Sequence, residues 1–173
     1  MRPTESVPTI ALDLDGVMAD LSTVIRAHLG FKHKILPSSL SFLWLRHIPH
    51  LFAELPLLPG ALEMFHALSH NNIYILTARP WPIGNFKTAR IDKRDWVHKK
   101  LDQNLAIKTI MGGGDKGRFA QPGHVLIDDL PRNIRNWEKK GGIGILHKSP
   151  KETLIRCEQL GLLKEPKQTI ARI

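Results

Sequence analysis

Five short apolar runs alternate with segments of helical pattern, and this alternation constrains the fold more than any other feature of the chain. The runs are rich in Ile, Leu and Val and lack polar alternation, which is typical of strands covered on both faces. Strands that alternate with helices favour a parallel sheet in an α/β fold. The expected strands lie within residues 9–15, 73–77, 107–111, 124–129 and 142–146.

Helical spacing of apolar residues recurs between these runs. In one such segment Trp96 and Val97 are followed by Leu101, while Lys99 and Lys100 come late, where cations suit the helix dipole. The basic part of this segment, residues 87–100, is interpreted as a solvated helix face. The expected helices lie within residues 60–70, 87–105, 131–140 and 150–160.

Residues 21–58 interrupt the alternation. This stretch is too apolar for a linker and too long for an ordinary loop. We expect it to be a small, mostly helical insertion between the first and second strands. The predicted core is then formed by residues 1–20 and 59–173.

Length and charge limit the class of protein. A chain of 173 residues with 42% hydrophobic residues suits one domain with a small insertion, and its net charge of +9 favours anionic partners. The single cysteine, Cys157, excludes an intrachain disulfide and a multi-cysteine zinc site. No apolar run approaches the roughly 20 residues needed to span a bilayer, and the N-terminus lacks a signal-peptide pattern. A cytoplasmic protein is therefore expected.

Polar residues follow the expected strands. The carboxyl ends of parallel strands meet at one edge of a sheet, where ligands bind. Two carboxylates placed together there need a cation or a proton between them. The residues at this edge are Asp13 and Asp15 after the first run, Thr77 after the second, Asp128 and Asp129 after the fourth, and Lys116 in a glycine-rich loop.

These residues resemble, in order, the four motifs of the haloacid dehalogenase (HAD) superfamily of phosphohydrolases. Within it, the chain is similar to the 5'(3')-deoxyribonucleotidases, with further likeness at 58–62 and 93–97. The resemblance implies a HAD-like Rossmannoid three-layer sandwich with a parallel central sheet. It also implies that residues 21–58 are a helical cap inserted after the first strand.

The resemblance also implies a mechanism. Asp13 would attack phosphorus to give an aspartyl-phosphate, and Asp15 would serve as general acid and base. Thr77, Ala78, Arg79 and Lys116 form the expected phosphate-binding set. Mg²⁺ would be held by Asp13, the main-chain carbonyl of Asp15, Asp128 and Asp129, and we favour Asp128 as the direct ligand over Asp129.

Two departures from the family concern the substrate. Ala78 stands where the deoxyribonucleotidases have Ser, and Arg79 adds a cation beside it. The insertion is also shorter than the family's cap, whose aromatic residues stack on the base. Phe42, Trp44 and Phe52 are the replacement candidates by position.

We therefore expect a Mg²⁺-dependent phosphomonoesterase acting on a small phosphorylated substrate, a deoxynucleoside monophosphate above all. Three alternatives stay open: a phosphatase of nucleic-acid 3' ends, a receiver-like phosphoacceptor domain, and a catalytically silent nucleotide-binding relative. The first would also be served by the +9 charge. The sequence leaves open the base preference and the 5' or 3' position of the phosphate. It also leaves open whether the protein is a monomer or a homodimer.

Overall fold

The computed structural model describes residues 7–30, 43–112 and 115–164. Its centre is a five-stranded sheet in the order β3-β2-β1-β4-β5, and every neighbouring pair is parallel. The expected strands are confirmed, with boundaries shifted by a few residues. They are β1 (Thr9–Leu12), β2 (Asn72–Arg79), β3 (Ala106–Met111), β4 (Val125–Asp128) and β5 (Ile143–Leu146).

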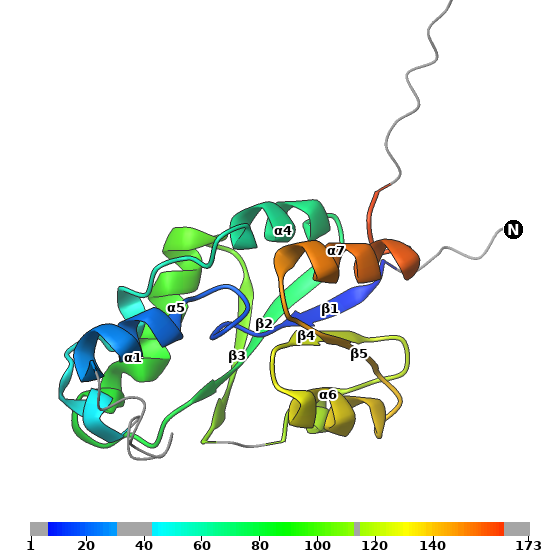
Figure 1. Cartoon of the computed structure of the whole chain (residues 1–173). Coiled ribbons are helices and arrows are strands. Elements are labelled where there is room, and N and C mark those ends of the chain that lie inside the picture. Colours follow the sequence, from blue (N-terminus) through cyan, green and yellow to red (C-terminus); the bar gives the residue numbers. More distant parts are fainter. Residues whose placement is uncertain (1–6, 31–42, 113–114, 165–173) are drawn as a thin grey trace, which may run out of the picture.

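Helices cover both faces of the sheet, so the three-layer prediction is confirmed (Figure 1). Successive strand residues point to opposite faces, so Leu12 and Ile127 belong to one apolar cluster while Ala11 and Leu126 belong to another. The first cluster includes side chains of α4 (Ala61–Leu68), α5 (Ala89–Lys100) and α7 (Pro150–Gln159). The second includes side chains of α6 (Pro131–Glu138) and packs against η4 (Lys116–Phe119).

The strand register determines which residues meet at the sheet edge. Leu12 of β1 pairs with Ile75 of β2 on one side and with Ile127 of β4 on the other. The residues that follow Leu12 and Ile127 are therefore neighbours, and the Asp13 amide donates to the Ile127 carbonyl at 3.0 Å. The chain adds β2 and β3 on one side of β1 before it crosses to β4. This reversal is the kind of switch point at which α/β sheets bind ligands.

The insertion after β1 is helical where it is described. It contains α1 (Leu21–Leu29) and two short 3-10 helices, η1 (Leu45–His47) and η2 (Leu51–Ala53). Phe52 shares one apolar cluster with Phe86 of η3 (Gly84–Thr88) and with Trp96 of α5. The Trp96 indole N–H also donates to the Leu55 carbonyl at 2.7 Å. The described part of the insertion is therefore packed into the main core, near the carboxyl ends of the strands.

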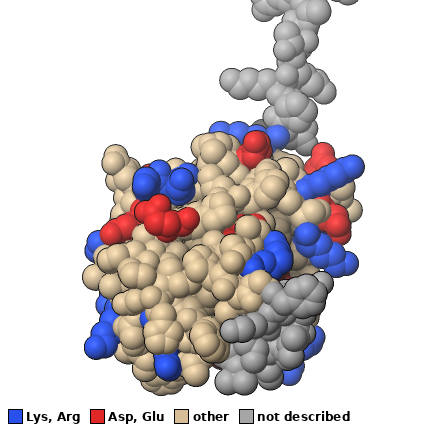
Figure 2. Space-filling view, turned by 60° about the vertical axis from the view of Figure 1, so that its left-hand side comes forward, with Lys and Arg blue, Asp and Glu red and all other residues tan. Residues whose placement is uncertain are grey.

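Charge is unevenly placed on the molecular surface. Figure 2 views the molecule from the left-hand side of Figure 1, and most of that face is uncharged, with Lys and Arg mainly around its margins. The excess positive charge of the chain is thus not gathered at the centre of this face. No helix in the described ranges combines the length and apolar character required to cross a bilayer.

Candidate active site

A tight turn follows β1 and presents the two carboxylates of Asp13 and Asp15. The Leu14 carbonyl accepts hydrogen bonds from the amides of residues 17–19, and Gly16 has a φ of 83°. A Cβ on Gly16 would lie 2.4 Å from Asp129 Oδ2. Glycine is therefore required at this position both for its backbone conformation and for the close approach of Asp129.

Three carboxylates converge beside this turn. Asp13, Asp128 and Asp129 each offer one oxygen, and these oxygens lie within 4.8 Å of one another. Asp128 is fully buried and accepts bonds from the Leu130 amide and from Asn133 Nδ2, which contacts both of its oxygens at 2.9 and 3.0 Å. The predicted convergence of the first and fourth strand ends is therefore present in the structure.

Lys116 places an ammonium between two of these acids. Its Nζ lies 2.7 Å from Asp13 Oδ1 and 2.6 Å from Asp128 Oδ2, and the side chain is 1% exposed. The preceding residue, Asp115, caps η4 by accepting the Gly117 amide at 2.8 Å. Gly117 lies against the Asn136 carbonyl, where a Cβ would come within 2.5 Å. Close packing of η4 on α6 thus directs Lys116 into the site.

Burial and mutual charge perturb the acids. Desolvation raises the pKa of Asp13 to about 7, the Lys116 ammonium opposes this, and Asp128 and Asp15 add to it. Desolvation and the Asp128 charge raise the pKa of Asp129 to about 6. Burial disfavours the ammonium of Lys116, but Asp13 and Asp128 outweigh this and raise its pKa. The cluster therefore has fewer positive charges than its carboxylates need in order to be fully ionised.

The cluster fits a hard divalent cation. All of its side-chain donors are carboxylate oxygens, which are the ligands that Mg²⁺ prefers. Close by, Asp15 Oδ1 is buried without a hydrogen-bond partner in the described residues. An oxygen-only donor set, raised carboxyl pKa values and an unpaired buried oxygen all favour an additional positive charge here.

A second buried lysine, Lys93 of α5, was not identified from the sequence as a site residue. It is fully buried, and its Nζ donates to Asp15 Oδ2 and, at 3.0 Å, to Thr77 Oγ1. Its ammonium also lies 4.9 Å from the centre of the Phe52 ring. One signal was available: Lys93 lies on the same helix face as Trp96 and Val97, and a lysine on an apolar face requires a partner.

Two cavities meet at Asp15 and Ala78. The smaller, about 200 Å³, is lined by charged side chains that include Asp13, Lys116 and Asp129. The larger, about 460 Å³, is mainly apolar; its lining includes Phe52, Arg79, Trp81, Ile83 and Phe86. Asp15 therefore lies where the cavity beside the acidic cluster joins a larger, mainly apolar one.

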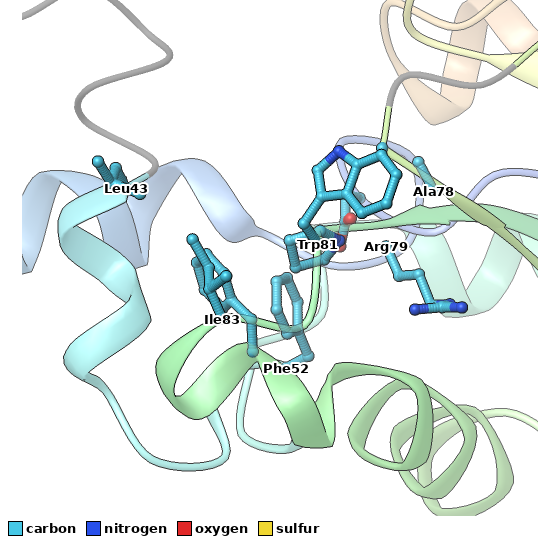
Figure 3. Close-up of a pocket in the computed structure, with 10 residues that line it drawn as sticks. Leu43, Phe52, Ala78, Arg79, Trp81 and Ile83 are labelled. Carbon is cyan, nitrogen blue, oxygen red and sulfur yellow. The ribbon is translucent and has the colours of Figure 1, made fainter.

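Trp81 forms a wall of the larger cavity and was not identified from the sequence. Its indole lies above the Phe52 ring in Figure 3, with Ile83 beside Phe52, while the Arg79 guanidinium extends away from this apolar group. Trp81 is 65% exposed. Gly112 lies beneath it, and a Cβ there would be 3.2 Å from the indole nitrogen. The sequence feature that could have identified Trp81 is its position four residues after Thr77, just past the end of β2.

The other predicted substrate residues have different outcomes. Arg79 lines the larger cavity, and its Nη1 contacts Met111 Sδ at 3.2 Å while its Nε has no hydrogen-bond partner in the described residues. Phe52 lines the cavity but is 1% exposed and packs on Phe86. Trp44 is 55% exposed and does not line either cavity. Phe42 lies outside the described residues.

Solved structures with a similar fold include hydrolases. A HAD family hydrolase from Deinococcus radiodurans R1, solved with bound phosphate and sodium, superposes with a TM-score of 0.55 at 15% identity, covering 93% of this chain and 99% of that one. A hydrolase from Streptococcus pneumoniae TIGR4 gives a TM-score of 0.51 at 10% identity, covering 90% and 98%. No curated protein matches the sequence.

The fold and the order of the site residues define a phosphatase of the haloacid dehalogenase superfamily. A narrower assignment comes from the sequence. The family described as "5' nucleotidase, deoxy (Pyrimidine), cytosolic type C protein" matches residues 30–172. The chain belongs to this family, and it is thus an enzyme of the phosphomonoesterase class. The matched range includes Thr77, Lys116, Asp128 and Asp129, while Asp13 and Asp15 precede it.

Proposed function

We propose that the protein is a Mg²⁺-dependent nucleotidase that removes the phosphate from a deoxynucleoside monophosphate through an aspartyl-phosphate. The observation that carries this proposal is the place of Asp15, at the junction of the smaller cavity, which Asp13 and Lys116 line, and the larger apolar cavity. A phosphomonoester bound across this junction has its phosphate beside Asp13 and its leaving group beside Phe52 and Trp81. The bond that breaks then lies next to Asp15.

Asp13 is the nucleophile in this proposal. Its Oδ1 is held by the Leu14 amide at 2.8 Å and by Lys116 at 2.7 Å, which leaves the other oxygen for attack on phosphorus. Attack forms the Asp13–phosphorus bond and breaks the bond to the leaving alcohol. Because the intermediate is covalent, one difficult substitution is divided into two easier ones.

Asp15 is the general acid and base. It protonates the leaving alcohol in the first step and takes a proton from the attacking water in the second. Lys93 holds one oxygen of Asp15 and also contacts Thr77, so it fixes the orientation of both side chains. The second Asp15 oxygen, Oδ1, has no partner in the described residues and is available to the substrate.

Positive groups surround the proposed phosphoryl position. Lys116 balances charge that develops on the phosphoryl oxygens. The Thr77 hydroxyl is fully buried outside both cavities, where it accepts from Lys93 and donates to the Ala78 carbonyl at 3.3 Å. Ala78 lines both cavities, and Arg79 lines the larger one at the side of the leaving group. Because Arg79 does not line the smaller cavity, its cation lies at the leaving-group side and does not replace the hydroxyl missing at Ala78.

The bound ion would be held by Asp13, the main-chain carbonyl of Asp15, and the Asp128–Asp129 pair. When bound, Mg²⁺ supplies positive charge that lets anionic side chains and an anionic phosphate share one site. A carboxylate has about four lone-pair positions, and Asp128 already accepts bonds from Lys116, the Leu130 amide and both contacts of Asn133. This supports Asp129 as the more available direct ligand, the reverse of the order that the sequence favours.

The apolar cavity supports a nucleoside as the leaving group. Its aromatic walls are Trp81 and Phe52, and its volume of about 460 Å³ is within the range of small-molecule sites. The planar Trp81 indole offers a surface on which a base can stack. A receiver-like phosphoacceptor has no need of such a leaving-group cavity, so this observation favours the enzyme. We also propose a cytoplasmic location.

The test is phosphate release from deoxy- and ribonucleoside monophosphates carrying the phosphate at the 5' or the 3' position, with and without Mg²⁺. We expect turnover only with the ion, and an activity decrease of at least about 10³-fold in Asp13→Asn. Lys99→Gln, on the exposed surface of α5, is the matched control. Full activity of Asp13→Asn, or absence of turnover on every nucleotide and on an aryl phosphate, would contradict the proposal.

A further inference from the structure

A third cavity, separate from the two that meet at Asp15, is lined by basic side chains. Its volume is about 930 Å³, the largest of the three, and it lies along α5 and the edge strand β3. None of its described lining residues is acidic. We call it the basic groove and define it by its six basic side chains: Arg79, Lys87, Arg90, Arg94, His98 and Lys108.

The cations of α5 and the turn before it form a continuous stripe. On α5, lining positions 90, 94 and 98 are four residues apart and position 91 is next to 90, which places them on one helix face. Lys87 lies in η3, three residues before Arg90. With a rise of 1.5 Å per residue, this stripe is about 16 Å long. A single phosphate group would occupy only part of it, so its length suits several successive negative charges.

Few of these charges are balanced within the protein. Lys87 and Arg90 are exposed and have no carboxylate partner in the described ranges, and Arg94 pairs only with the exposed Asp95. Ile91, between the cations, is 53% exposed. The lining also includes the aromatic ring of Phe119. A cationic groove that holds an aromatic ring suits a nucleic-acid strand, whose backbone follows the cations and whose bases can stack on the ring.

Arg79 connects the groove to the catalytic site. It lines both the basic groove and the apolar cavity that contains Asp15. Its Nε is buried without a hydrogen-bond partner in the described residues, so no contact within them fixes that donor. A strand lying in the groove can therefore direct its terminal nucleotide toward Asp15.

We propose that the basic groove binds the sugar-phosphate backbone of a single-stranded nucleic acid whose terminal phosphomonoester enters the catalytic site. If the groove binds a strand in this way, the enzyme hydrolyses terminal phosphates of strands as well as mononucleotides. This claim about hydrolysis depends on the proposed function. The claim that the groove binds a strand does not depend on the proposed function, because binding requires only the charges of the groove. Two separate measurements therefore test the two parts.

The first measurement is the affinity for a fluorescent single-stranded oligonucleotide carrying a terminal phosphate, with Asp13→Asn as the background so that nothing is turned over. For roughly four phosphate contacts, the affinity should fall about 50-fold between about 50 and 200 mM salt. The double variant Lys87→Gln/Arg90→Gln should bind about tenfold more weakly. Lys99→Gln/Lys100→Gln loses the same charge from α5 outside the groove lining and should bind within about twofold of the parent.

Equal weakening by both double variants would overturn the proposal, because it would reflect net charge alone. Binding that does not respond to salt would overturn it too. So would a poly-glutamate peptide or a duplex that competes as well as the single strand, since the groove would then be a site for another polyanion. Circular dichroism and thermal unfolding would establish that all variants are folded.

The second measurement is phosphate release by the active enzyme. The Lys87→Gln/Arg90→Gln variant should lose about tenfold in kcat/KM on the phosphorylated oligonucleotide and keep its activity on the mononucleotide. Equal loss on both substrates would overturn the extension to strand ends. If neither substrate were hydrolysed by the parent enzyme, the proposed function would fail, while the binding result would still decide whether the groove takes a strand.

Discussion

The Lys116 ammonium lies 2.7 Å from Asp13 Oδ1, and both side chains are almost completely buried. The lysine and the proposed nucleophile come from segments about 100 residues apart in the chain. Their contact neutralises part of an acidic cluster in which the pKa values of Asp13 and Asp129 are raised. This arrangement makes the stability of the protein depend on the same group that the proposed reaction uses.

Replacing Lys116 should therefore destabilise the protein as well as inactivate it. Lys116→Met leaves Asp13 and Asp128 buried without their cation, which should cost about 3–5 kcal/mol of unfolding free energy in metal-free buffer. Urea unfolding without divalent ions measures this, and Lys99→Met on the exposed surface of α5 is the control. If Lys116→Met were as stable as the control, the buried ion pairs would not have the role inferred here.

Lys93 should act on the step that depends on the leaving group. Lys93→Met removes the donor that holds Asp15 and Thr77. We expect kcat/KM, which reports the steps up to departure of the leaving group and not the later attack of water, to fall about 10²-fold on an alkyl phosphate, which needs protonation by Asp15. The fall should be much smaller on p-nitrophenyl phosphate, whose leaving group does not need it. Steady-state kinetics on both substrates, with Lys87→Met as the control, measure the difference. Equal losses on both would show that Lys93 does not act through Asp15.

Alanine substitutions at Gly16 and at Gly123 should distinguish the effect of a steric clash from the effect of backbone conformation. Both have a positive φ, 83° and 78°, but a Cβ on Gly16 would meet Asp129 whereas nothing lies within 4 Å of one on Gly123. Each Gly→Ala change should cost about 1–2 kcal/mol through the backbone. Gly16→Ala alone should also lose phosphatase activity and weaken Mg²⁺ binding, measured by calorimetry. Comparable activity in the two variants would contradict the close approach of Asp129.

Trp81 should contribute to binding of the leaving group and not to the chemical step. Trp81→Ala removes the exposed indole from the wall of the apolar cavity. We expect KM for a nucleoside monophosphate to rise about tenfold, equivalent to about 1.4 kcal/mol, with kcat little changed. Glycerol phosphate, which has no ring to stack, should be unaffected. An equal effect on both substrates would indicate a general disturbance of the site.

Cys157 should be unreactive in the folded protein. It is the only cysteine of the chain, it is fully buried in α7, and burial raises the pKa of its thiol from 9.0 to about 11. At pH 8 the folded chain should therefore contain about 100-fold less thiolate than the unfolded chain. Because the folded pKa is the higher one, unfolding free energy should fall as the pH rises from about 9 toward 11. Rapid labelling of native protein by a thiol reagent would contradict this burial.

Much of the site could be predicted because strand ends are a local feature of the sequence. Asp13, Thr77 and Asp128 each lie at or directly after the end of an apolar run. Once the runs are read as parallel strands, their carboxyl ends must share one edge of the sheet. The close approach of Asp13 to Asp128 was expected on this basis and is present.

The substrate side was harder to predict. Position in the insertion indicated Trp44 and Phe52, but Trp44 does not line either catalytic cavity and Phe52 is largely a core residue. The exposed wall of the cavity is instead Trp81, which follows β2. Which aromatic residue faces a cavity depends on how η1, η2 and η3 pack together, and this packing has no local sequence signal.

The amino-acid sequence alone determined the parallel α/β fold and the set of carboxylates at its edge, because strand period and strand ends are properties of neighbouring residues. Only the tertiary structure decided that Lys93 holds Asp15, that Lys116 bridges Asp13 and Asp128, and that the cations of α5 line a groove. These contacts join residues far apart in the chain. Their geometry is determined by how helices pack on the sheet, so it exists only once the core has formed.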